Sequence, residues 1–168
     1  MAKKTAYMGM LTALAFVLSY LESLIPINLG VPGIKLGLAN LVVIIALYTM
    51  DTKMAFTLSL VRILLTGFTF GNLSTMIYSL AGGMLSLGIM IFVKRFPVFS
   101  VTGVSVLGGV FHNVGQIAAA ALIAETGSLF YYLPVLIFSG TIAGTLIGIL
   151  ASILIRHLTK TENREQSN

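Results

Sequence analysis

The stretch that decides the fold is GGVFHNVGQIAAAALIA, residues Gly108–Ala124. Most of its side chains are as apolar as a lipid tail, but His112, Asn113 and Gln116 lie among them. The stretch belongs to a longer apolar run, Val98–Ala124, which exceeds the roughly 20 residues that a helix needs to cross a bilayer. It therefore predicts a membrane-spanning helix, in which strongly polar side chains need a reason to be present.

The composition of the whole chain agrees with a membrane protein. Of its 168 residues, 57% are hydrophobic and 9% are charged, and the mean hydropathy is +1.01. Soluble domains carry about 25% charged residues, so this chain lacks the polar surface of a protein that folds in water. Length and composition together predict a single small integral membrane domain. The chain has no cysteine, which excludes disulfides, thiol catalysis and metal sites built on cysteine.

Six apolar segments follow one another, separated by turn or charge signals. The first begins like a signal peptide, but its apolar run is longer than usual and further spans follow, so we expect a retained helix. The sequence predicts an all-α integral membrane protein, a six-transmembrane-helix bundle over residues 1–156, with a disordered cytoplasmic tail over residues 157–168. The segments are Thr5–Ile25, Leu36–Met50, Met54–Phe70, Leu73–Val93, Val98–Ala124 and Tyr131–Ile155.

The basic residues predict the orientation of the bundle. If the N-terminus lies inside, eight lysines and arginines fall on the cytoplasmic side, whereas the outer loops hold only Lys35, and Arg62 lies within a helix. This asymmetry indicates that both termini are cytoplasmic, in a multi-pass protein of the cell membrane. The formal net charge of +5 is then a topology signal, and nucleic-acid binding is not needed to explain it. The eight residues are Lys3, Lys4, Lys53, Lys94, Arg95, Arg156, Lys160 and Arg164.

Polar side chains in or near the predicted spans form the candidate site. A charge at the bilayer centre costs roughly 2.5–3.5 kcal/mol, so Arg62, about 12 Å into its helix, should face the bundle interior and have a partner. One reading is an internal polar network, in which Glu22 neutralises Arg62 or Lys35. The other is a water-accessible pocket in the outer half of the bundle, where the positive charge in excess of Glu22 suits an anionic solute. The candidate substrate-binding residues are Glu22, Lys35, Asn40, Arg62, Asn72, His112, Asn113 and Gln116.

Two stripes of small residues predict close contacts between helices. The stripe in the last segment repeats every four residues, and we expect it to pack against another helix of the same chain. The stripe in the first segment lies near its cytoplasmic end, where it serves either internal packing or the docking of another subunit. The packing stripe is Gly140, Gly144, Gly148 and Ser152, and the candidate docking residues are Ala2, Ala6, Gly9 and Ala13.

The sequence carries no motif for catalysis. It has one aspartate, Asp51, so it cannot form the paired aspartate-rich Mg²⁺ sites that bind a diphosphate for prenyl transfer. It has no phosphate-binding loop for ATP, and its two histidines, His112 and His157, are too few and too far apart for a convincing metal site. We predict no catalytic residue, no metal and no cofactor. Any uphill transport would draw its energy from an ion gradient or a partner.

Four stretches carry a resemblance to a known family: PGIKLGLANLVVIIALY, VRILLTGFTFGN, SLAGG and GGVFHNVGQIAAA. Over Gly9–Ile155 the chain resembles the bacterial Gx transporter family, whose members are also labelled heptaprenyl diphosphate synthase component I. That family in turn resembles the S-components of energy-coupling-factor transporters, small six-helix proteins that capture a vitamin-like solute from outside.

The resemblance implies both a function and a partner. S-components use a small-residue surface on their first helix, which Gly9 and Ala13 match, to dock a transmembrane coupling subunit that two ATPases drive. The implied function is a substrate-binding membrane subunit for uptake or trafficking of a small anionic or vitamin-like solute. The synthase label implies a different function, a membrane accessory subunit of isoprenoid diphosphate synthesis. A third possibility is a self-contained ion-coupled carrier.

Overall fold

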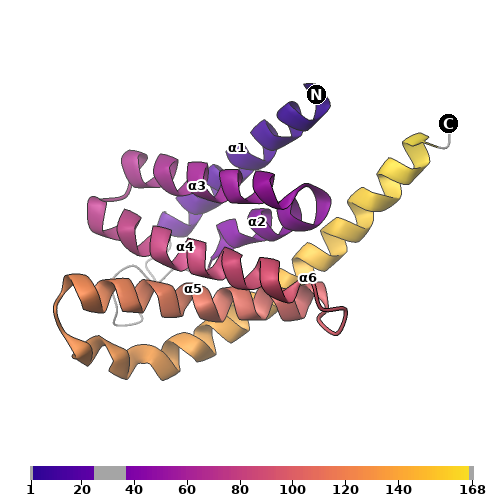
Figure 1. The fold of residues 1–168 in the computed structure, drawn as a ribbon. Helices are drawn as coiled ribbons and strands as arrows, with labels where there is room; N and C mark the ends of the chain where they lie inside the picture. The colour runs from indigo at the N-terminus through magenta and orange to yellow at the C-terminus, as the bar shows by residue number, and fades with distance from the viewer. Residues whose placement is uncertain (1, 25–36, 167–168) are drawn as a thin grey trace.

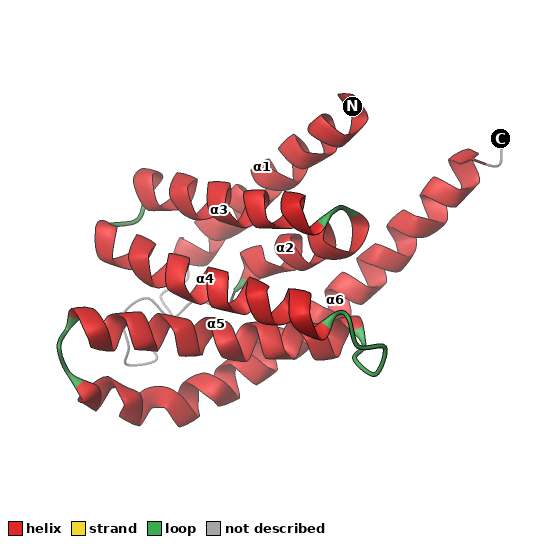
Figure 2. Ribbon diagram, viewed as in Figure 1, coloured by secondary structure: helices red, strands yellow, loops and turns green. Residues whose placement is uncertain are grey.

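The computed structural model describes residues 2–24 and 37–166 of the chain. Within these ranges every regular element is a helix (Figure 2), so the predicted all-α class is confirmed. The elements are α1 (Ala2–Leu24), α2 (Leu38–Thr49), α3 (Thr52–Thr69), α4 (Leu73–Val93), α5 (Val101–Ile123), a short 3₁₀ helix η1 (Gly127–Tyr132) and α6 (Leu133–Gln166).

Four of these segments are long and apolar enough to cross a membrane: α1, α4, α5 and the continuous η1–α6 segment. The 12 residues of α2 reach only about 18 Å, against a hydrocarbon core of about 30 Å. The 18 residues of α3 include two cations, Lys53 and Arg62, which make this helix more polar. The six predicted spans are thus all present as helices, and length and composition support four of them as membrane spans.

The short helix α2 lies inside the bundle. Its side chains from Val42 to Leu47 are all buried, and it packs against α1, α3 and α6 (Figure 1). A helix that is apolar on every side is expected in an interior. The helix α5 packs between α4 and α6, and these are the most extensive helix contacts of the described chain.

Glycines allow α6 to approach α5 closely. A Cβ atom added to Gly140 would lie 2.9 Å from the carbonyl oxygen of Gly109, and one added to Gly144 would lie 2.7 Å from the Cα atom of Val106. Gly148 is enclosed as tightly, and real Cβ atoms essentially never come within 3.0 Å of another heavy atom. These glycines therefore pack inside the chain, which confirms the role predicted for them.

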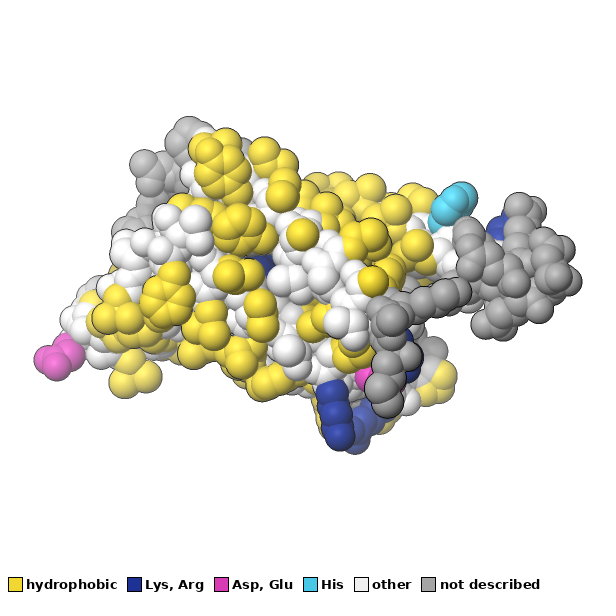
Figure 3. Space-filling view, turned by 90° about the horizontal axis from the view of Figure 1, so that it is seen from above, with side chains coloured by type: hydrophobic (Ala, Val, Ile, Leu, Met, Phe, Trp, Pro, Cys, Tyr) yellow, Lys and Arg dark blue, Asp and Glu magenta, His cyan; other side chains and the backbone are white. Residues whose placement is uncertain are grey.

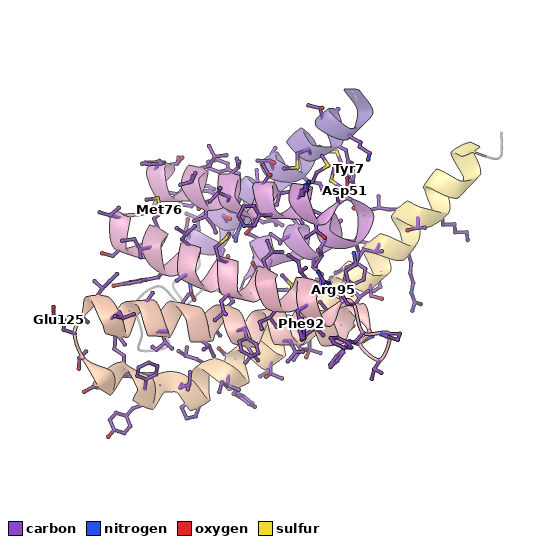
Figure 4. All side chains as sticks on the ribbon, viewed as in Figure 1. Tyr7, Asp51, Met76, Phe92, Arg95 and Glu125 are labelled. Atoms are coloured by element: carbon purple, nitrogen blue, oxygen red, sulfur yellow. The ribbon has the colours of Figure 1, made fainter. Side chains whose placement is uncertain are left out.

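Both termini lie at the same end of the bundle (Figure 1). Tyr7, Asp51 and Arg95 lie toward this end, whereas Met76 and Glu125 lie toward the opposite end (Figure 4). Successive helices run in opposite directions between the two ends. In the space-filling view, hydrophobic side chains cover the middle of the molecule and most of the charged side chains lie toward its ends (Figure 3). Such a surface suits lipid tails around its middle and water at its ends.

The last helix is longer than the sequence analysis expects. The 34 residues of α6 extend about 51 Å, and its C-terminal part projects beyond the bundle (Figure 1). The expected disordered tail begins at residue 157, but α6 continues to Gln166. Residues 157–166 contain no glycine or proline and include several good helix formers, such as leucine, lysine, glutamate and arginine, so the helix propagates beyond its apolar part.

Candidate functional site

Polar side chains from five helices converge on one pocket. The pocket lies near the last turn of α1, the first turn of α2 and the second half of α3, so it is in the half of the bundle away from the termini. The open space between its side chains is about 10 Å³, which is about the size of one water molecule. The lining residues are Ser19, Glu22, Gly37, Asn40, Arg62, Ile63, Thr66, Ser79 and His112.

Glu22 connects the end of α1 to the start of α2. Its side chain is buried, and its carboxylate accepts a hydrogen bond from the backbone N–H of Gly37. Gly37 has a φ of 79°, in the left-handed region that favours glycine, and its carbonyl oxygen accepts a hydrogen bond of 2.7 Å from the backbone N–H of Asn40. The carboxylate and the glycine together fix where α2 begins, and they place Asn40 in the first turn, beside the pocket.

Arg62 supplies the positive charge of the pocket. It is 8% exposed and lies on the buried face of α3, together with Ser59 and Thr66, which are three and four residues away and so share its side of the helix. Glu22 is near enough to interact with it electrostatically. The Nε donor of Arg62 is buried and has no hydrogen-bond partner among the described residues. An unsatisfied charged donor costs free energy, so this N–H is available to a solute or to water.

The three polar residues of α5 have different neighbours. His112, Asn113 and Gln116 are all buried, but only His112 lines the pocket. The Nδ2 atom of Asn113 donates a hydrogen bond of 2.8 Å to the carbonyl oxygen of Leu136, so Asn113 joins α5 to α6. Gln116 packs against α4, because a Cβ atom added to Gly82 would lie 2.7 Å from its Cγ atom.

Asn72 has a different position. It is exposed and caps α4: its side-chain oxygen accepts a hydrogen bond of 2.8 Å from the backbone N–H of Thr75, and its own N–H donates to the Thr75 hydroxyl at 2.9 Å. It does not line the pocket. Lys35 lies outside the described residues. The structure therefore brings together four of the eight candidate residues, Glu22, Asn40, Arg62 and His112.

Three hydroxyl residues of the pocket are absent from the candidate set: Ser19, Thr66 and Ser79. Helical spacing is a signal for two of them, since Ser19 precedes Glu22 by three residues and Thr66 follows Arg62 by four. Ser79 has no such signal, because it lies on a helix that contributes no other polar candidate to the pocket. As for metals, among the described side chains, those of residues 4–24 and 37–160, no three His, Asp or Glu are grouped so that they could hold an ion.

The small residues of α1 lie on the outside of the bundle. Ala6, Gly9 and Ala13 are exposed, and a Cβ atom added to Gly9 would meet nothing within 4 Å. Ala2 begins α1, but its side chain lies outside the described part. In contrast to the glycines of α6, these residues are not covered by another described helix, so internal packing does not account for them.

A helical bundle with four long apolar helices and a polar pocket in its interior is typical of a small membrane-embedded protein. The chain matches the family model described as heptaprenyl diphosphate synthase component I over residues 11–154, and it belongs to this family. The resemblance to the family labelled heptaprenyl diphosphate synthase component I, noted from the sequence motifs, is thereby confirmed. No curated protein and no solved structure matches the chain.

Proposed function

We propose that the chain is a substrate-binding subunit of a membrane transport system for a small anionic or vitamin-like solute, and that its pocket takes the negatively charged group of that solute. The observation that carries the proposal is the pocket itself. Polar side chains from α1 to α5 meet there, around a buried arginine, in a bundle whose surface is mainly apolar. Buried ionisable groups between membrane helices commonly mark a solute pathway.

Arg62 is the residue that would bind the solute. Its guanidinium can make paired hydrogen bonds to a carboxylate or phosphate, and its Nε donor has no partner among the described residues. Without solute, Glu22 balances its charge. Asn40 and His112 flank the same space and would orient the polar edges of the solute. Because the open space is only about 10 Å³, side chains must move apart for anything larger than water, so binding and local rearrangement are coupled.

We propose that all six helices lie in the cell membrane, with α2 buried among the others and both termini in the cytoplasm. The basic residues support this orientation. Lys4, Lys53, Lys94 and Arg95 all adjoin helix ends on the side of the termini, and basic residues favour the cytoplasmic side. The pocket then lies in the outer half of the membrane and receives solute from outside. The C-terminal part of α6, from residue 157, extends on the cytoplasmic side.

The exposed small residues of α1 would dock the partner. Ala6, Gly9 and Ala13 form a surface without long side chains, which allows a helix of a second membrane protein to approach closely. We propose a transmembrane coupling subunit, driven by two ATPases, as this partner, because the chain itself has no ATP-binding motif.

The family description favours a second candidate function, an accessory membrane subunit of heptaprenyl diphosphate synthesis. In that case a separate, soluble prenyl synthase would carry out the chemistry, and this chain would hold the lipid product. The single aspartate of the chain, Asp51, is exposed and forms an ion pair of 3.7 Å with Lys4. It therefore cannot supply the metal-binding carboxylates of that reaction.

A pull-down of the tagged protein from its native membrane, with mass spectrometry of the proteins recovered, separates the two functions. We expect a transmembrane subunit and two ATPases, and we expect Gly9→Leu to remove them. Gly88→Leu on α4 is the matched control, since Gly88 is also an exposed helical glycine with nothing within 4 Å of an added Cβ atom. Recovery of a soluble aspartate-rich prenyl synthase instead would make the accessory-subunit function correct and the transport function wrong.

A further inference from the structure

The connection between α4 and α5 is a compact turn with an unusual surface. It comprises residues 94–100, KRFPVFS, at the end of the bundle that holds the termini. The backbone N–H groups of Lys94, Arg95, Phe96 and Phe99 all donate hydrogen bonds within the turn or to the end of α4. The next residue, Ser100, accepts a hydrogen bond from Gly103 and caps α5. The turn is therefore a closed structure, whose backbone donors are mostly satisfied.

Three apolar side chains of the turn are exposed. Val98 is 88% exposed, Phe96 46% and Phe99 43%. The ring of Phe96 packs edge-on against that of Phe92, at 5.2 Å between centroids, and Phe92 is itself exposed on α4. The apolar surface of the turn thus continues the apolar surface of the helix. Exposed apolar patches of this kind usually meet a protein or a membrane.

The two cations of the turn have different surroundings. Lys94 donates a hydrogen bond of 2.6 Å to the carbonyl oxygen of Leu47 at the end of α2, and its ammonium lies 4.7 Å from the centre of the Tyr48 ring. Partial burial also lowers the pKa of Lys94 below its ordinary value. The ammonium group of Lys94 is thus already bound by α2. Arg95 is exposed beside the aromatic side chains, so its charge is available to an external anion.

The position of the turn indicates that its exposed surface contacts lipid. The turn follows α4 directly and leads into α5, and both helices are long and apolar enough to cross a bilayer. It must therefore lie where lipid tails give way to headgroups. Paired backbone donors lower the cost of entering this region, and aromatic side chains are favourable there. Anionic headgroups complement the positive charge of Arg95.

We propose that residues 94–100 are an interfacial lipid anchor: Phe96, Val98 and Phe99 insert at the boundary between headgroups and acyl chains, and Arg95 binds the phosphate of an anionic phospholipid. This anchor is separate from the pocket at Arg62, and it does not depend on what the pocket binds. It would hold the α4–α5 end of the bundle at a fixed depth in one leaflet.

The chain has no tryptophan, so single tryptophan variants report insertion without background from other tryptophans. We expect lipids brominated near the headgroup to quench Phe96→Trp and Phe99→Trp several-fold more strongly than Thr159→Trp, which lies on the exposed C-terminal part of α6. Iodide in the water should quench in the reverse order. Equal iodide quenching at positions 96 and 159, with no quenching by brominated lipid, would show that the turn faces water or a protein and would overturn the proposal.

A second measurement tests the anionic lipid. The Phe96→Trp protein is placed in two preparations of mixed phosphatidylglycerol and phosphatidylcholine vesicles. In one preparation only the phosphatidylglycerol carries bromine, and in the other only the phosphatidylcholine does. Attraction of one basic residue to an anionic headgroup predicts an enrichment of phosphatidylglycerol near the tryptophan of about fivefold. Adding Arg95→Gln should remove this preference. Adding Lys53→Gln instead should leave the preference unchanged, because Lys53 is a different exposed basic residue near a helix end on the same side. Equal quenching by both lipids before any charge is removed would overturn the role of Arg95.

Discussion

Gly82→Ala is expected to destabilise the bundle because α4 and α5 cross at this residue. An added Cβ atom would lie 2.6 Å from the backbone carbonyl oxygen of His112 and 2.7 Å from the Cγ atom of Gln116. The nearest ordinary contact is 3.4 Å, so α5 must move away by about 0.8 Å. On the other side of the crossing, a Cβ atom added to Gly115 would lie 2.8 Å from the Cα atom of Gly82. Neither helix therefore has room to yield locally.

The change in unfolding free energy caused by Gly82→Ala is the sum of two opposing effects. Overpacking a close contact costs about 1–3 kcal/mol, whereas replacing glycine by alanine within a helix gains about 1 kcal/mol. Gly88→Ala on the same helix isolates the second term, because a Cβ atom added to Gly88 meets nothing within 4 Å. The difference between the two variants is then the overpacking cost, about 1–3 kcal/mol.

Thermal unfolding in detergent, followed by far-ultraviolet circular dichroism, measures this difference. At about 3 °C per kcal/mol for a chain of this size, Gly82→Ala should melt about 3–9 °C below Gly88→Ala. Gly88→Ala itself should melt slightly above the wild-type protein. If the two variants melt at the same temperature, the close approach of α4 to α5 at Gly82 is wrong, and with it the placement of His112 beside the pocket.

Two further substitutions test contacts at the helix ends. Asn72→Ala removes the capping box of α4 and should lower Tm by about 3 °C, the effect of about 1 kcal/mol. It should not change the solute recovered with the protein. Loss of that solute would show that Asn72 belongs to the binding site. Lys94→Met removes the hydrogen bond to Leu47 and the contact with the Tyr48 ring and should lower Tm by a similar amount. Lys53→Met, at an exposed lysine, should leave Tm unchanged, so equal effects of the two lysine variants would contradict the structural role of Lys94.

The sequence predicts the individual helices well, because the signals for them are local. The predicted segment Leu73–Val93 has the same bounds as α4, since Asn72 provides a cap at one end and the charged pair Lys94 and Arg95 follows the other. The sequence does not predict the end of α6, because a loss of hydropathy marks the end of an apolar segment but does not end a helix. Only glycine, proline or a cap does so reliably.

The partners of the polar side chains could be predicted only in part. Spacing shows which residues share a face of one helix, but not which neighbouring helix that face meets. His112 and Gln116 lie four residues apart and both contact Gly82 of α4, yet only His112 also lines the pocket. Asn113, beside them in sequence, bonds to α6. By contrast, the burial of Arg62 near Glu22 follows directly from the cost of an unpaired charge in a membrane.

In the proposed function, Arg62 binds the negative group of a solute and is more than a structural partner of Glu22. The most direct test of this role is mass spectrometry of the small molecules that leave the purified protein on denaturation, normalised to the yield of folded protein. We expect an anionic compound with the wild-type protein and with Arg95→Ala, a control at an exposed arginine. We expect its loss from Arg62→Ala at nearly unchanged yield. The double variant Glu22→Gln, Arg62→Met removes both buried charges and keeps the test valid if the single variant folds poorly. Retention of the compound per folded protein, by Arg62→Ala or by the double variant, would contradict this role and leave Arg62 as part of an internal polar network.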